Sequence, residues 1–118
     1  MADYKRYITQ VQENGNVMVS EDVIAAIVLQ SAAEVEGVDS ISAKPGSELN
    51  LKNWNKGMKI MIAEDNDLSI DCNVLVKYGH SVVDVAKNLQ NAITVAVESM
   101  AGVKVSSVNI NVCGIAQQ

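Results

Sequence analysis

Polar and apolar residues alternate most regularly between positions 58 and 78. Residues 58–63 and 68–78 have the pattern of two strands joined by a polar turn at residues 64–67. By the two-residue period, the apolar residues of the second strand share one face, namely Leu68, Ile70, Cys72, Val74, Val76 and Tyr78. We therefore expect one face of this sheet to be packed and the other to be solvated, as in an antiparallel sheet with helices on a single side.

The segment after Ser20 has the apolar spacing of a helix. Ser20 is a favourable N-cap, and Glu21 and Asp22 place acidic side chains in the first turn, where the helix dipole favours them. We expect this helix to run to about Val35. Gly37 is then expected to close it in the left-handed conformation that glycine adopts freely.

The segment after Ser81 is predicted as a second helix with a cleaner division between its sides. Ser81 is its expected N-cap, Asp84 is a capping-box-like partner, and Gly102 is expected to end it. At about 100° per residue one side of this helix is apolar, and it contains Val82, Val85, Ala86, Leu89, Ala92, Ile93, Ala96, Val97 and Met100.

The remaining strands are shorter or less regular. Strands are predicted at residues 17–19 and 38–42, and Asn14-Gly15 gives a weak hairpin signal before the first of them. The last strand is expected from Val103, and its apolar residues change parity after Val105, which predicts a bulge at Ser106-Ser107. Residues 43–57 contain the only proline with several glycines and asparagines, and are predicted to form one long loop.

The order β-α-β-β-β-α-β predicts an α+β fold, a two-layer sandwich with two helices packed on one face of a mixed sheet. A chain of 118 residues has the length of one domain. We expect this domain to span residues 15–115. A polar N-terminal segment at residues 1–14, which can be flexible, precedes it, and a short tail at residues 116–118 follows it.

The first helix carries more apolar residues than the sheet requires. The residues expected to cover the sheet are Val23, Ile24, Ile27, Val28 and Val35. Ala26, Leu29 and Ala33 add a second apolar stripe, and a helix that is apolar nearly all round is usually buried on both sides. Either this stripe packs against the second helix, where alanines permit close approach, or it is an exposed patch for self-association or for docking an anchor protein.

The solvated face of the sheet is the other candidate interaction surface. Asp71, Asn73 and Lys77 are predicted on this face of the hairpin strand, and Asn109 and Asn111 on that of the last strand. Polar alternation is what an uncovered antiparallel sheet requires, so a hydrated surface explains these residues. The alternative is a platform for a protein partner.

Charge and composition argue against nucleic-acid binding. The formal net charge is −5 and aromatic residues make up 3% of the chain, whereas nucleic-acid binders rely on clustered lysine and arginine and on stacking rings. Lys52, Lys56 and Lys59 are the densest basic group and are interpreted as part of a solvated loop. We expect no specific nucleic-acid partner.

The motifs of catalysis and of ligand binding are not found in the sequence. His80 is the only histidine, and no second titratable group is placed beside it by pattern. Residues 64–67 are acidic but lack the spacing of a calcium loop, and Cys72 and Cys113 lack metal-binding spacing and are predicted as buried thiols. We predict no catalytic, cofactor-binding or metal-binding residues and no cofactor, so the protein is not expected to be an enzyme.

The sequence gives no sign of a membrane segment. Residues 1–16 lack the apolar core of a secretory signal, and the longest apolar run, residues 23–29, is far shorter than the ~18 residues that a spanning helix needs. A soluble cytoplasmic protein without direct membrane insertion is expected.

Several segments, in order, resemble the alkaline shock protein family, the general-stress and envelope-stress proteins of Gram-positive bacteria. The most specific is Ala33-Glu34-Val35-Glu36-Gly37-Val38. The others are Gly15 to Ser20, Lys56-Gly57-Met58-Lys59-Ile60, Asp71 to Gly79, Val97 to Val103 and Val108 to Val112.

This resemblance implies a non-enzymatic protein of the stress response and of cell-envelope homeostasis that acts through protein–protein contacts. It further implies that the partners are other copies of the chain, an integral membrane anchor protein, or both, so that the protein can be held at the inner face of the cell membrane. The alternative is an RNA-binding module, because a small sheet backed by two helices is a shape that KH-like modules share.

Overall fold

The sheet is built on its longest buried strand, β5 (Leu68–Lys77). In this computed structural model, which describes residues 5–42 and 53–117, β5 pairs antiparallel with β3 (Val38–Ile41) and β4 (Met58–Ile62) along one side. β6 (Val105–Ala116) pairs with it in parallel along the other side. β3 and β4 therefore share one edge of β5 end to end, and the mixed sheet predicted from the sequence is confirmed.

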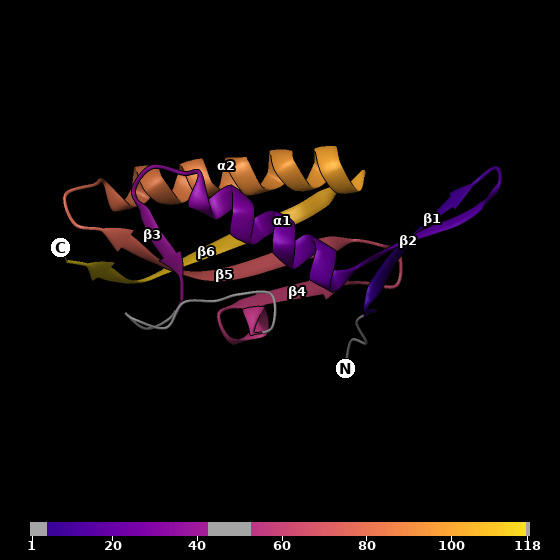
Figure 1. Ribbon diagram of the computed structural model, residues 1–118, viewed down its shortest axis with the longest axis horizontal. Helices are drawn as coiled ribbons and strands as arrows, with labels where there is room; N and C mark the ends of the chain where they lie inside the picture. The colour runs from indigo at the N-terminus through magenta and orange to yellow at the C-terminus, as the bar shows by residue number, and fades with distance from the viewer. Residues whose placement is uncertain (1–4, 43–52, 118) are drawn as a thin grey trace.

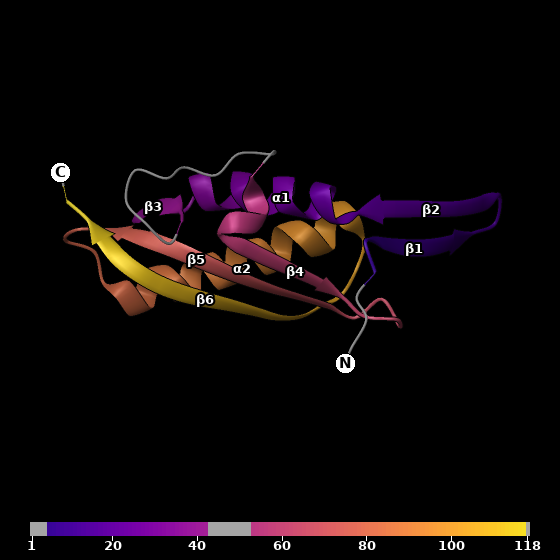
Figure 2. The ribbon, with the colours of Figure 1, turned by 90° about the horizontal axis from the view of Figure 1, so that it is seen from below.

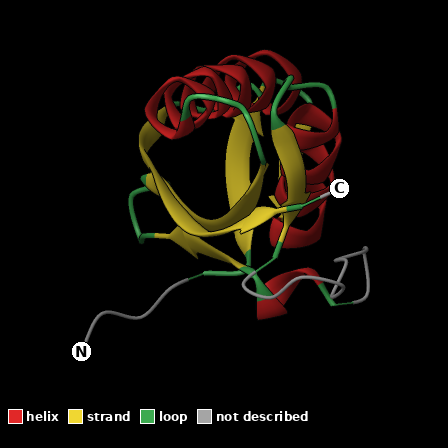
Figure 3. Cartoon of the chain, turned by 90° about the vertical axis from the view of Figure 1, so that its left-hand side faces the viewer, coloured by secondary structure: helices red, strands yellow, loops and turns green. Residues whose placement is uncertain are grey.

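Two helices, α1 (Glu21–Ala33) and α2 (Val82–Ala101), cover one face of this sheet (Figure 1). Figure 3, which looks along the molecule, shows both helices on the same side of the curved strands. The two-layer α+β arrangement is therefore as predicted. α2 forms the connection between the parallel strands β5 and β6, which a parallel pair requires.

The core lies between the helices and the sheet. Its centre is formed by residues that are 0% exposed, in the sheet and in both helices. These are Leu68, Ile70, Cys72, Val74 and Val76 of β5, Ile24 and Val28 of α1, and Leu89, Ile93 and Val97 of α2. Tyr78 was predicted on the packed face and is instead 72% exposed, because β5 ends at Lys77 and the chain turns at Gly79.

A β-hairpin precedes α1. β1 (Tyr7–Gln12) pairs antiparallel with β2 (Gly15–Ser20), so the weak turn signal at Asn14-Gly15 was correct and Gly15 has a φ of 136°. The hairpin extends beyond the helices and the sheet (Figure 1), and the whole molecule measures 51 × 25 × 24 Å.

The base of the hairpin is attached to the domain by side chains. Ile8 is 1% exposed, and the Gln10 Nε2 donates to the carbonyl oxygens of Ala101 and Gly102, both at 3.0 Å. Asn66, in the turn between β4 and β5, donates from Nδ2 to the Thr9 carbonyl at 3.1 Å.

The ends of the helices agree only in part with their predicted signals. The Ser20 hydroxyl accepts from the Val23 N–H at 3.4 Å, and Gly102 ends α2 with a φ of 68°. Ser81 occupies the N-cap position of α2, but its side chain makes no capping hydrogen bond.

Gly37 does not close α1, which ends at Ala33 with Glu34 as its C-cap. It has the expected positive φ, 94°, but it lies in the turn that enters β3. A Cβ atom at this position would lie 2.6 Å from Val85 Cγ2. The glycine is therefore needed both for its backbone conformation and for the close approach of α2.

β6 contains the predicted bulge and a second one. Leu68 lies opposite Val105 and Ser69 opposite Ser107, which leaves Ser106 as the extra residue. Further along, Val74 lies opposite Val112 and Leu75 opposite Gly114, which leaves Cys113 extra. Cys72 is buried as predicted. The prediction for Cys113 was wrong: it is exposed, because it has the parity of Asn109 and Asn111 and lies on the face of β6 opposite to Val108, Ile110 and Val112.

The predicted long loop falls partly outside the described residues, and Lys52 with it. Its end contains the 3-10 helix η1 (Trp54–Lys56). Trp54 is buried, and its Nε1 donates to Asp22 Oδ1 at 2.7 Å, which ties the end of the loop to the first turn of α1.

Candidate interaction surfaces

The polar residues predicted on the open face of the sheet do lie together there. Asp71 is opposite Asn109, whose Nδ2 donates to Asp71 Oδ1 at 2.6 Å. Asn73 is opposite Asn111, whose Nδ2 donates to Asn73 Oδ1 at 3.3 Å. We call these four residues the polar ladder, and Lys77 lies exposed beyond its end.

A shallow hollow of about 260 Å³ lies beside the polar ladder. Its lining combines exposed Lys56 and Lys59 with Asp71 and the amides of Asn73 and Asn111. Lys59 is the strand neighbour of Asp71, so the carboxylate partly offsets the positive charge of the hollow. Because the lining carries both positive and negative side chains, it favours neither anionic nor cationic ligands.

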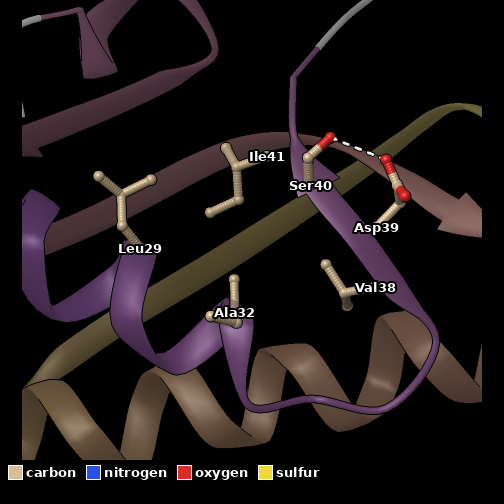
Figure 4. A pocket seen from close by; sticks show the side chains of 7 residues that line it. Leu29, Ala32, Val38, Asp39, Ser40 and Ile41 are labelled. Carbon is tan, nitrogen blue, oxygen red and sulfur yellow. Dashed lines mark hydrogen bonds between the residues drawn. The ribbon is translucent and has the colours of Figure 1, made fainter. Parts of the chain in front are cut away.

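The predicted apolar stripe of α1 is divided between two places. Leu29 is half-buried and faces β3, where it lines a cavity of about 160 Å³ with Ala33, Val38 and Ile41 (Figure 4). Ala33 is exposed at the rim. Of the three stripe residues, only Ala26 lies on the side of α1 that faces α2.

Ala26 belongs to a groove between the two helices, with a volume of about 390 Å³. We call it the interhelical groove, and it is lined by Val23, Ala26, Ile27, Gln30, Ser31 and Glu34 of α1 and by Ala96 and Met100 of α2. Val23 is 47% exposed and Met100 73% exposed.

Val23 was predicted to cover the sheet, which was wrong, and Met100, predicted on the apolar side of the second helix, is exposed rather than packed. They lie near the start of α1 and near the end of α2, and together they border the groove. The spacing of Val23, Ala26 and Gln30, at i, i+3 and i+7, places them along one side of α1 and was the signal that could have revealed the groove.

The residues examined for chemistry do not form a reactive arrangement. His80 is exposed in the turn before α2, and within residues 5–42 and 53–117 no group of histidine, cysteine and acidic side chains is placed to hold a metal ion. Asp65 Oδ1 accepts from the Asp67 N–H at 3.1 Å, so the acidic segment organises its own turn. Burial, with a smaller contribution from Asp71, raises the pKa of the Cys72 thiol to about 12, so it stays protonated at neutral pH.

The order of elements and the sequence segments that build them agree with one known family. The family model that matches residues 9–117 is that of the alkaline shock proteins, described as having a cell envelope-related function. The chain belongs to this family. The match includes the β1–β2 hairpin from Thr9 onward as well as the sandwich.

Relatives of this alkaline shock family member occur in Gram-positive bacteria. This chain is 34% identical to the uncharacterized protein Spy1535 of Streptococcus pyogenes over 102 residues. The aligned region covers 86% of this chain and 79% of that protein. The chain is 31% identical over 109 residues to Spy1614 of the same species (87% and 89%), and 28% identical over 107 residues to YloU of Bacillus subtilis (86% and 88%). No solved structure matches the chain significantly.

Within the described part of the chain, neither helix combines the length and the apolar character needed to cross a membrane.

Proposed function

We propose that this protein serves the cell envelope without catalysing a reaction, through contacts with other proteins in the stress response and in envelope homeostasis. The observation that carries the proposal is the interhelical groove. It holds two large apolar side chains, Val23 and Met100, at the surface of a chain whose net charge is −5. Exposed apolar surface with a polar rim is typical of protein-docking sites.

The partner proposed for this groove is a segment of an integral membrane anchor at the inner face of the membrane. The small residues Ala26 and Ala96 leave room for the apolar side chains of a helix laid along the groove. Glu34 adds a carboxylate to the lining. Cytoplasmic segments next to membrane spans are enriched in lysine and arginine, which complement such a carboxylate. Other copies of the chain are the second proposed kind of partner.

Two exposed apolar residues of α2 provide a matched test. Met100 lines the groove, whereas Val95, which is 55% exposed, does not. In pull-downs from native membranes, the wild-type protein and Val95→Lys are expected to recover the same integral membrane protein. Met100→Lys is expected to recover at least about tenfold less, because a charge then enters the apolar contact.

Both variants change a surface residue, so equal thermal unfolding temperatures would show that the fold is retained. Recovery of the membrane protein by folded Met100→Lys would contradict docking in the groove. If the wild-type protein recovers no membrane protein, the anchor proposal itself is wrong.

A further inference from the structure

β6 is an edge strand that is open along most of its outer side. Within residues 5–42 and 53–117, no strand pairs with β6 other than β5. Figure 2 shows β6 running along one margin of the sheet. Side chains of α2 reach it twice near its start, where Gln90 Nε2 donates to the Val108 carbonyl and the Val105 N–H donates to Glu98 Oε2, both at 3.0 Å.

The open edge has a regular central segment. The bulges at Ser106 and Cys113 delimit it, and between them the strand has an uninterrupted register with β5. Since the Val108 carbonyl is bound by Gln90 of the overlying helix, it points away from β5. The two-residue period then directs the backbone groups of Ile110 and Val112 outward as well. Ile110 is the centre of this outward set.

Between its two bulges, this edge has no charged or proline residue to block pairing. Natural edge strands are commonly blocked by charged residues or proline, yet residues 105–116 contain neither. Two copies of a chain with a net charge of −5 repel each other, and an uncharged strand is where they can meet without opposing like charges.

We propose that β6 pairs antiparallel with β6 of a second copy about a two-fold axis through Ile110, which joins the two sheets into one. Val108 then lies opposite Val112 of the second copy, and the half-buried Ile110 meets its own equivalent. This inference rests on the proposed function, in that it names the surface through which copies of the chain associate.

The polar ladder fits this register. Residues 109 and 111 become the non-hydrogen-bonded positions, where side chains of facing strands are closest. Asn109 then faces Asn111 of the second copy. After the hydrogen bond that it makes to β5, each amide keeps a further N–H donor and its oxygen acceptor. A row of side-chain hydrogen bonds from Asp71 through Asn109 can therefore continue to Asn111 of the second copy.

A charge exchange across the axis tests this register. In Asn109→Lys/Asn111→Lys, lysine faces lysine of the other copy at both positions. In Asn109→Lys/Asn111→Glu, lysine faces glutamate at both positions. By sedimentation equilibrium, the wild-type protein is expected to form dimers. The lysine–lysine variant is expected to raise the dimer dissociation constant at least about tenfold relative to the lysine–glutamate variant, since facing like charges repel and facing opposite charges attract.

Gln90→Ala adds a change in the opposite direction. Pairing at Val108 requires the Gln90 side chain to release the Val108 carbonyl, so its removal is expected to tighten the dimer at least about fivefold, which corresponds to one net hydrogen bond. Circular dichroism would establish that each variant is folded.

The outcomes separate the possible failures. A monomeric wild-type protein, or equal dissociation constants for the two charge variants, overturns pairing through β6. Dimers that ignore all three changes would place self-association on another surface. The test of the membrane anchor uses a different measurement, recovery of a membrane protein, and a different residue, Met100 of the groove. Failure of the anchor proposal can therefore be distinguished from failure of pairing through β6.

Discussion

At the scale of single residues, Cys72 couples the core to pH. Its thiol is 0% exposed between the sheet and the helices, and burial raises its pKa from 9.0 to about 12. The folded state therefore holds a proton that the unfolded state releases above pH 9. The stability contributed by the neutral thiol is complete below that pH and is lost as the pH rises toward 12.

We predict that the free energy of unfolding of the wild-type protein falls by about 1.4 kcal/mol more than that of Cys72→Ala between pH 8 and pH 10. Urea unfolding of both proteins at the two pH values measures the two decreases in unfolding free energy. The cost of truncating Cys72 is the same at both pH values and cancels when the decreases are compared. Equal decreases in the two proteins would contradict the coupling.

Gly37 and Gly79 form a natural pair for measuring a steric contact. Their φ angles are 94° and 98°, but an added Cβ would meet Val85 Cγ2 at 2.6 Å in Gly37 and no atom within 4 Å in Gly79. Gly79→Ala is expected to cost about 1–2 kcal/mol, the penalty for a positive φ. Gly37→Ala is expected to cost about 1–3 kcal/mol more, because the turn before β3 and α2 must move apart at Val85.

Denaturant unfolding of both variants measures this gap. Costs equal within about 0.5 kcal/mol would show that α2 yields freely at Val85.

The sequence predicted that Gly37 has a positive φ, but not its reason. Spacing along a chain shows where a helix pattern stops, whereas the contact with Val85 depends on how two elements 48 positions apart are packed. Cys113 was misplaced for a different reason. It has the parity of Asn109 and Asn111, opposite to that of Val108, Ile110 and Val112, so the alternation of the strand already places it on the exposed face.

At the scale of elements, the sandwich was clearly predictable, whereas the hairpin before it was indicated only by the weak signal at Asn14-Gly15. β4, β5 and α2 follow clean periods of two residues and 3.6 residues, so their positions were predicted closely. β1 and β2 have little such pattern because most of their side chains are exposed, and Ile8 alone is fully buried in β1. The hairpin is held in place by contacts with residues far away in the sequence, and the pattern of a short segment does not reveal such contacts.

Gln10 is expected to hold the hairpin against the end of α2. Its amide makes bonds to the Ala101 and Gly102 carbonyls, so Gln10→Ala is predicted to cost about 1–2 kcal/mol. A two-stranded hairpin is marginal by itself, and local opening should therefore follow. Hydrogen exchange is expected to accelerate in residues 7–20 and to stay unchanged in β5. Uniform acceleration in both would show that the hairpin and the sandwich unfold together.

The candidate surfaces were predicted with unequal success at this scale. The polar ladder follows from strand parity, so its four members were identified correctly. The stripe on α1 was identified as surplus apolar surface, but its partners were not, because the angle between helices is not encoded in either helix alone. Leu29 therefore lies toward β3 while Ala26 lies toward α2.

At the scale of the whole molecule, the charge balance predicts weak interaction with RNA. The net charge is −5, and of the densest lysine group described, Lys56 and Lys59 share their hollow with Asp71. We expect no dissociation constant tighter than about 1 μM at physiological salt, the tight end of the non-specific range. Fluorescence anisotropy with a labelled single-stranded RNA measures it. Submicromolar, salt-sensitive binding would instead favour an RNA-binding module.

The central position of β5 has a consequence for synthesis on the ribosome. β3 and β4 are synthesised before β5. The parallel neighbour of β5, β6, ends at Ala116, 39 residues after Lys77. At a synthesis rate of about 5–20 residues per second, roughly 2–8 s pass during which one edge of the apolar strand β5 has no paired strand. During that interval the nascent chain offers chaperones a segment that the finished protein conceals, so slow codons between positions 78 and 116 should lower the yield of folded protein more than slow codons elsewhere.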